Sequence, residues 1–181
     1  MTIRFALLGA RPSDLAASLL GTAGDLGGSS ELVLIVGHEP VSLPDDAPDI
    51  TALQLPPELH GDDVAVDGWL LETLLSHAVD LLVTLGPGQA VGATTASTLQ
   101  HRILTLEALP NGVSGEPSVL VSVRLWTADP DRPNPIVVQR TMATGEPGDE
   151  ADDVGARTQL LLEVLDLLTA GTVDLDGLAD A

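Results

Sequence analysis

The first residues that could do chemistry lie in a short turn near the start of the chain, Gly9-Ala-Arg-Pro-Ser-Asp14. An apolar run, Ile3–Leu8, precedes this turn and a helix-forming segment follows it, so the turn joins a strand to a helix. The amide groups at the start of a helix favour an anion, and Arg11 and Ser13 would add a positive charge and a hydroxyl. The alternative is a structural turn in which Ser13 caps the helix and Asp14 occupies its first turn.

The other reactive side chains form no recognisable site. The chain has no cysteine, which excludes disulfides, thiolate metal sites and a cysteine nucleophile. Ser114 lacks the elbow motif of a serine hydrolase. The four histidines are His38, His60, His77 and His101. None of them has metal-ligand spacing to another. We therefore expect neither a metal site nor hydrolase chemistry.

The charge of the chain limits its partners. It has 27 acidic and 7 basic residues, a net charge of −20, and the basic residues are scattered arginines. A nucleic-acid surface needs clustered cations, so we expect neither nucleic acid nor an anionic membrane surface as a partner. No segment reaches the roughly eighteen apolar residues of a membrane span, and the N-terminus does not match a signal peptide. We expect a cytoplasmic protein.

Apolar runs alternate with helix-forming segments through the first hundred residues. Strands are expected at Ile3–Leu8, Leu32–Val36, Ile50–Leu55, Asp80–Leu85, Ile103–Leu106, Val119–Leu125 and Ile136–Met142. Helices are expected at Asp14–Leu20, from Asp62 or Asp63 to His77, at Ala90–Leu99 and at Ala151–Thr169. This order predicts an α/β, Rossmann-like three-layer fold, with a mostly parallel sheet extended by C-terminal antiparallel strands.

A sheet of this kind binds ligands at the carboxyl ends of its strands. The loops after Leu8, Leu85, Leu106 and Leu125 are therefore candidate sites. We expect one domain over residues 1–171, because Gly171 ends the last helix. Residues 172–181 form an acidic tail that could be loose.

The most informative stretch is Pro135-Ile-Val-Val-Gln-Arg140 followed by Gly148-Asp-Glu-Ala-Asp-Asp-Val-Gly-Ala-Arg157. A β-branched run leads through a turn into an acidic helix start and an apolar-striped helix. In order and residue type this unit resembles the closing strand and helix of the 10-formyltetrahydrofolate-dependent formyltransferases, most closely the glycinamide ribonucleotide type. The resemblance covers roughly residues 2–170 and implies the formyltransferase fold, with 79–110 and 135–170 aligning best.

The resemblance also locates the positions of the family's catalytic residues. The family has Asn-x-His-Pro-Ser-Leu-Leu-Pro where this chain has Ile103-Leu-Thr-Leu-Glu-Ala-Leu-Pro110. The Asn polarises the formyl oxygen and the His stabilises the oxyanion of the tetrahedral intermediate. Thr105 stands at the Asn position and Glu107 at the His position. A threonine offers one donor, and a glutamate is an acceptor whose charge repels an oxyanion.

The family's third catalytic residue is an Asp just before the Pro-Ile/Val-x-x-Gln strand. In strict register this position holds Arg132, and a one-residue slip would bring in Asp131. Arg132 facing Glu107 would be a charge-complementary replacement of the His–Asp pair. Otherwise Arg132 is a solvated turn residue.

Two further parts of the family's site are altered. The loop that closes on the pterin ring corresponds to Gly86-Pro-Gly-Gln-Ala-Val91, which lacks the family's bulky apolar side chains. Folate would contact backbone groups there, at Gly86, Gly88, Gln89 and Val91. The interval from Ala108 to Asp131 is too short for the family's substrate-holding helix. The turn with Arg11 and Ser13 corresponds to the family's substrate-phosphate site.

These departures lead to two hypotheses. The first is a formyltransferase-fold protein with a degenerate catalytic triad, a pseudoenzyme or a partner or regulatory subunit that lacks ordinary formyl transfer. The second is a diverged formyltransferase that moves a formyl group from 10-formyltetrahydrofolate to a small amine. Only the second implies that cofactor, whereas a small-molecule or protein partner fits both. Methionyl-tRNA is the least expected substrate, because the chain is acidic and has no second domain.

Overall fold

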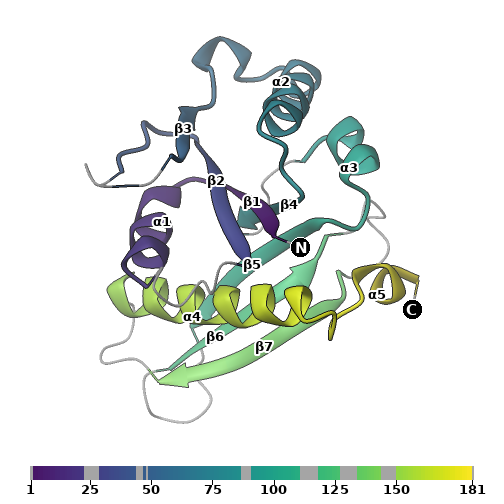
Figure 1. The fold of residues 1–181 in the computed structure, drawn as a ribbon. Helices are drawn as coiled ribbons and strands as arrows, with labels where there is room; N and C mark the ends of the chain where they lie inside the picture. The colour runs from purple at the N-terminus through teal and green to yellow at the C-terminus, as the bar shows by residue number, and fades with distance from the viewer. Residues whose placement is uncertain are drawn as a thin grey trace.

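A seven-stranded sheet forms the centre of the fold, in the order β3-β2-β1-β4-β5-β6-β7 (Figure 1). The computed structural model describes residues 2–22, 29–43, 47, 49–86, 91–110, 118–126, 134–143 and 150–180. The strands are β1 Ile3–Gly9, β2 Ser30–Gly37, β3 Thr51–Gln54, β4 Leu81–Leu85, β5 Ile103–Pro110, β6 Ser118–Leu125 and β7 Ile136–Ala143. Strands β1 to β5 pair in parallel, and β6 and β7 continue the sheet antiparallel. The predicted fold class is confirmed.

Helices cover both faces of the sheet, which makes three layers (Figure 1). They are α1 Pro12–Gly21, α2 Asp63–Ser76, α3 Ala93–Leu99, α4 Glu150–Thr169 and α5 Leu175–Asp180, with a 3-10 turn, η1, at Pro57–Leu59. Helices α1, α4 and α5 pack on one face. Helices α2 and α3 cover the other face over β1, β2 and β4, and their apolar cluster includes Ile103 of β5 but no residue of β6 or β7. Among the described residues no helix is both long and apolar enough to span a membrane.

The start of α1 differs from the expectation. The helix begins at Pro12, and the capping position is held by Arg11 without a side-chain hydrogen bond to the helix. The prediction that Ser13 caps this helix is wrong, because the fixed φ of proline suits the first helical position. Ser13 lies inside the first turn instead, where its Oγ accepts a hydrogen bond of 3.4 Å from the backbone of Ser42.

Strand β5 is longer than predicted and continues to Pro110. The sequence suggested an end at Leu106, because Glu107 interrupts the apolar run. The strand continues because β6 pairs with it from Leu104↔Leu125 to Pro110↔Val119. Glu107 therefore lies within a strand, and the loop expected directly after Leu106 does not exist.

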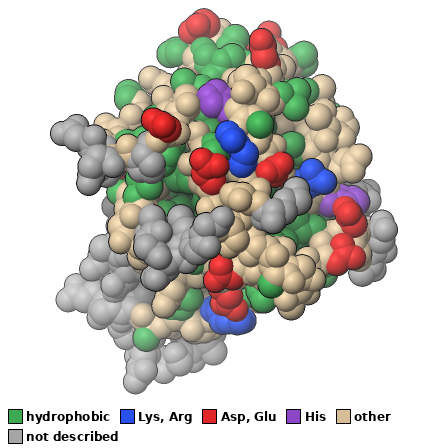
Figure 2. All heavy atoms as spheres, in the orientation of Figure 1, with side chains coloured by type: hydrophobic (Ala, Val, Ile, Leu, Met, Phe, Trp, Pro, Cys, Tyr) green, Lys and Arg blue, Asp and Glu red, His purple; other side chains and the backbone are tan. Residues whose placement is uncertain are grey.

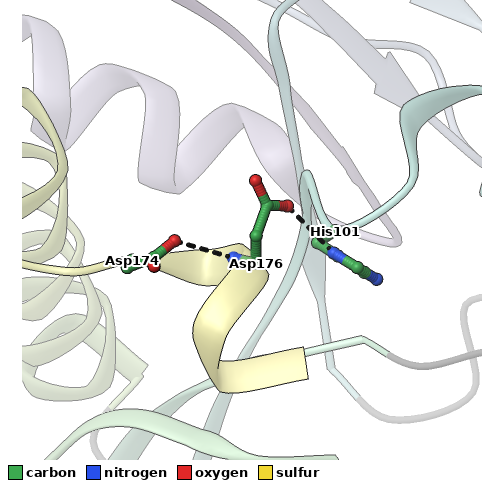
Figure 3. A network of polar contacts seen from close by, with 3 residues as sticks. All are labelled: His101, Asp174 and Asp176. Atoms are coloured by element: carbon green, nitrogen blue, oxygen red, sulfur yellow. Dashed lines mark hydrogen bonds and ion pairs between the residues drawn. The ribbon is translucent and has the colours of Figure 1, made fainter. Parts of the chain in front are cut away.

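The last ten residues contain a helix, α5, rather than a wholly loose tail. Ala179 is buried against the α1/α4 side of the core. Figure 3 shows two contacts at the start of α5: the Asp174 carboxylate accepts from the Asp176 amide at 3.2 Å, and Asp176 lies 2.9 Å from His101 Nδ1. These contacts attach the end of the chain to the turn before β5.

Gly9 allows β1 and β4 to approach closely at their carboxyl ends. A Cβ at this position would lie 2.7 Å from Leu85 Cβ. We expect Gly9→Ala to destabilise the protein by about 1–3 kcal/mol through overpacking. The control is Gly21→Ala at the end of α1, where nothing lies within 4 Å of the new Cβ and alanine favours the helix. Urea unfolding measures the change in stability of both variants. Equal losses of stability would contradict the close approach of β1 and β4 at Gly9.

Candidate functional site

Four polar side chains share one face at the β5–β6 pair. Thr105 pairs with Arg124 across the two strands, and Glu107 pairs with Ser122. Because side chains alternate along a strand, Thr105 and Glu107 point to the same face. Their neighbours Leu104 and Leu106 belong to the α1/α4 core cluster on the opposite face. The polar strip, Thr105, Glu107, Ser122 and Arg124, therefore lies on the α2/α3 side, beyond the apolar cluster of those helices.

Thr105 is held in place by the neighbouring parallel strand. It is 4 % exposed, and its Oγ1 accepts a hydrogen bond of 3.1 Å from Thr84 Oγ1 on β4. The same Thr84 hydroxyl lies 3.3 Å from the Leu104 carbonyl oxygen. The hydrogen bond from Thr84 therefore fixes the short Thr105 side chain against β4.

Glu107 forms an ion pair across the sheet. Its Oε2 lies 3.6 Å from Arg124 Nε, and the two side chains are 18 % and 30 % exposed. Arg124 also donates to the Asn134 carbonyl oxygen at 3.3 Å. The guanidinium thus offsets the carboxylate charge next to Thr105. Chemically, the strip offers hydroxyl and guanidinium donors and one carboxylate, without the imidazole that the family's reaction uses.

Arg124 is the residue that sequence reasoning missed. One alternative from the sequence placed Arg132 opposite Glu107, but Arg132 and Asp131 lie outside the described residues. The signal was present in the alternation of β6, where Val121 and Val123 point to the core and Arg124 to the other face. Choosing Arg124 also required the β5–β6 register, since a shift of one residue would reverse the faces.

We expect the Glu107–Arg124 pair to contribute modestly to stability. A double-mutant cycle with Glu107→Gln and Arg124→Gln should give a coupling energy of about 0.5–1 kcal/mol by urea unfolding, because solvent screens partly exposed pairs. The control is the Arg140–Glu163 pair, whose side chains are 52 % and 36 % exposed. We expect weaker coupling there, and a larger value for the control would argue against a specific role for burial of the Glu107 pair.

The predicted folate loop is described only at its two ends. Gly86 has a positive φ of 93°, and its amide donates to the Leu106 carbonyl oxygen at 3.0 Å. Val91 is 7 % exposed and belongs to the α2/α3 core cluster, so its side chain is not open to a ligand. Gly88 and Gln89 lie outside the described residues. Folate contact through the backbone here stays a prediction.

Anion binding at the start of α1 also stays a prediction. Arg11 is exposed and Ser13 is partly exposed. Both lie at the carboxyl end of β1, two strands from Thr105 in the sheet. The structure thus places the turn and the polar strip on the same edge, as expected for parallel strands.

Asp67 was not singled out from the sequence, although it contacts the start of the helix that follows the predicted folate loop. This residue of α2 is 6 % exposed. Its carboxylate accepts from the Thr94 amide at 2.8 Å and the Thr95 amide at 3.1 Å, in the first turn of α3. Burial acts to raise the pKa of Asp67, but hydrogen bonds from Thr95 and Thr94 outweigh it, so the pKa lies below its usual value. The carboxylate therefore caps α3 from another helix.

In the part of the chain that the structure describes, no group of three His, Asp or Glu side chains could hold a metal ion. On the face drawn in Figure 2, the described basic side chains stand singly, with acidic ones close by, rather than gathered in a patch.

Comparisons with known proteins identify the fold. No protein-family model and no curated protein matches the sequence. Among solved structures, the chain is similar to glycinamide ribonucleotide transformylase 1 from Symbiobacterium toebii, with 20 % identity, a TM-score of 0.69 and coverage of 94 % of this chain and 89 % of that one. It is also similar to glycinamide ribonucleotide transformylase 1 from Geobacillus kaustophilus, with 18 % identity, a TM-score of 0.69 and coverage of 93 % of this chain and 100 % of that one.

A formyltetrahydrofolate deformylase from Burkholderia mallei is similar as well, with 15 % identity and a TM-score of 0.62 over 93 % of this chain and 64 % of that one. The match over nearly the whole chain shows that this protein has the fold of the formyltransferases. At these identities the likeness concerns the fold alone.

Proposed function

We propose that this chain is a formyltransferase-fold protein that does not perform ordinary formyl transfer and acts as a pseudoenzyme or as a partner or regulatory subunit. One observation carries the proposal: Glu107, at the position where the resemblance expects the oxyanion-stabilising histidine, is paired with Arg124. A developing oxyanion needs donors aimed at it. Here the Arg124 guanidinium is already paired with the Glu107 carboxylate.

The polar strip supports a binding role. Thr105 and Ser122 are buried at 4 % exposure each, so the strip presents to a partner the partly exposed Glu107 and Arg124 side chains, which offset each other's charge. A small-molecule or protein partner suits such a surface. The single, dispersed arginines on the face drawn in Figure 2 favour a partner other than nucleic acid.

The second candidate is a diverged formyltransferase that uses 10-formyltetrahydrofolate and a small amine. The observation in its favour is the position of Arg124 directly opposite Thr105. A guanidinium with five N–H donors could replace the lost asparagine and histidine donors if Glu107 moved away. The folds of the similar transformylases are consistent with this chemistry.

A thermal shift experiment separates the two candidates. Under the leading proposal, 10-formyltetrahydrofolate and tetrahydrofolate leave the unfolding midpoint unchanged. A ligand at a hundred times its dissociation constant would stabilise the protein by about 2.7 kcal/mol, which is readily seen. The Geobacillus kaustophilus transformylase serves as the positive control. A clear shift that Arg124→Gln abolishes would favour the diverged enzyme instead.

A further inference from the structure

A second concave site lies on the same edge of the sheet, away from the polar strip. It is a cleft of about 290 Å³ where β1, β2 and β3 end and α2 begins. Its apolar lining is Leu8, Val36, Leu55, Val66, Trp69 and Leu70. In the sheet, β4 separates β1 from the strand that carries Thr105 and Glu107. None of the four residues of the polar strip lines the cleft, and neither do Gly86 and Val91, the described ends of the predicted folate loop.

The lining of the cleft suits a flat ring. The side chains at its base, Leu8, Val36 and Leu70, are at most 6 % exposed and form part of the packed core. Trp69 and Val66 on α2 are only partly buried and pack at the edge of that core or beside it. An indole with an accessible surface provides a stacking face for an aromatic ligand. The volume is close to that of the smallest ligand pockets and fits one ring system.

The rim of the cleft determines the charge of the ligand. It carries the exposed side chains of His38, His60 and Asp63, and no arginine is among the described residues that line the cleft. Within the described part of the chain, the Asp63 carboxylate has no hydrogen bond or ion pair. The neighbouring Asp62 carboxylate caps α2 by accepting from the Ala65 amide at 3.0 Å. Two carboxylates thus occupy the helix N-terminus that would otherwise attract an anion.

We propose that this cleft binds a small planar aromatic cation, such as an aryl amidine or an aminated heterocycle. The ring lies against Trp69 over the apolar base, and the positive group lies at Asp63. The net charge of −20 further favours a cation over an anion. The cation also interacts with the face of the indole when the two stack.

Three probes of equal size and different charge test the proposal: benzamidine, benzamide and benzoate. Titration followed by NMR on the indole resonances separates the cleft from the rest of the protein, because the chain has only two tryptophans. We expect the Trp69 signal to move and benzamidine to bind about tenfold tighter than benzoate, with benzamide between them. Benzoate binding as tightly as benzamidine, or no binding of any probe at millimolar concentration, would overturn the proposal.

Two matched pairs of variants locate the binding. Asp63→Asn should weaken benzamidine about threefold and leave benzamide unchanged, whereas Glu72→Gln, which removes an exposed charge elsewhere on α2, should change neither. Val66→Trp fills the cleft and should abolish binding, whereas Val64→Trp, at a side chain 83 % exposed, should not. Benzamidine binding that survives Val66→Trp, or that ignores Asp63→Asn, contradicts the assignment. If Val66→Trp fails to fold, the comparison of Asp63→Asn with Glu72→Gln tests the proposal by itself.

Discussion

Asp67→Ala is expected to lower the free energy of unfolding by about 2–3 kcal/mol, the largest loss of stability we predict for a single polar side chain of this protein. The substitution removes the acceptor of the Thr94 and Thr95 amides at the start of α3. Thr95 is fully buried, so its amide would lose its partner without access to water. Loss of a cap typically costs about 1 kcal/mol, and an unsatisfied buried donor adds about 1–3 kcal/mol.

Asp62→Ala is the matched control for this prediction. Asp62 also caps a helix, but it is exposed and accepts a single hydrogen bond from Ala65. Water can replace that acceptor, so we expect a loss of about 1 kcal/mol or less. Urea unfolding followed by circular dichroism measures both variants. Equal losses would show that the buried geometry of Asp67 adds nothing to ordinary capping.

The lowered pKa of Asp67 also predicts a pH dependence. The folded protein holds this carboxylate ionised more strongly than the unfolded chain does, because the α3 amides bind the charged form. The stabilisation is therefore complete above the ordinary aspartate pKa of about 4 and is lost as the pH falls through the lower pKa of the folded state. The stability difference between wild type and Asp67→Asn should narrow on acidification below about pH 4. A stability difference that widens below about pH 4 would contradict the lowered pKa of Asp67.

The second large effect concerns catalysis. With 10-formyltetrahydrofolate and glycinamide ribonucleotide, we expect formyl transfer to be at least about 10⁴-fold slower than that of the Geobacillus kaustophilus transformylase measured in parallel. Loss of one oxyanion donor typically costs a factor of about 10²–10³. The resemblance predicts that Thr105 and Glu107 stand at two such positions, and the Glu107 carboxylate is paired with the Arg124 guanidinium.

Glu107→Ala and Arg124→Gln give this prediction its internal control. If the chain lacks ordinary formyl transfer, neither variant changes the residual rate of tetrahydrofolate formation, because neither residue acts on a formyl group. A rate within tenfold of the transformylase would overturn the proposed function. So would a tenfold loss of the residual rate in Arg124→Gln with unchanged stability, which would assign that guanidinium to catalysis.

Much of the fold could be predicted because its signals are local. Continuous apolar runs such as Leu32–Val36 indicate strands buried on both faces. A helix start was predicted at Asp62 or Asp63, and the structure begins α2 at Asp63 with Asp62 as its cap. Less predictable were the element ends. The start of α1 depended on Pro12, and the length of β5 depended on pairing with β6.

The candidate site was predictable in position but not in its contacts. Parallel strands bring their carboxyl ends to one edge, so the turn after β1 and the strand with Thr105 were expected near each other. The partner of Glu107 was not predictable, because it depends on the register of an antiparallel pair joined by residues 111–117. Asp67 was missed for a related reason: it is a polar residue in an apolar helix pattern, and its partners lie 27 and 28 residues further along the chain.

The sequence by itself therefore determined the order and type of most elements and the class of the sheet, and through the resemblance it predicted that Thr105 and Glu107 replace the asparagine and histidine. Those properties follow from side-chain type and short-range periodicity. Only the tertiary structure decided that Arg124 pairs with Glu107, that Asp67 caps α3 and that an apolar cleft with Asp63 at its rim opens where β1 to β3 end. Each of these three features depends on segments that sheet register and helix packing bring together. Small changes in this long-range geometry alter the contacts without changing any local sequence pattern.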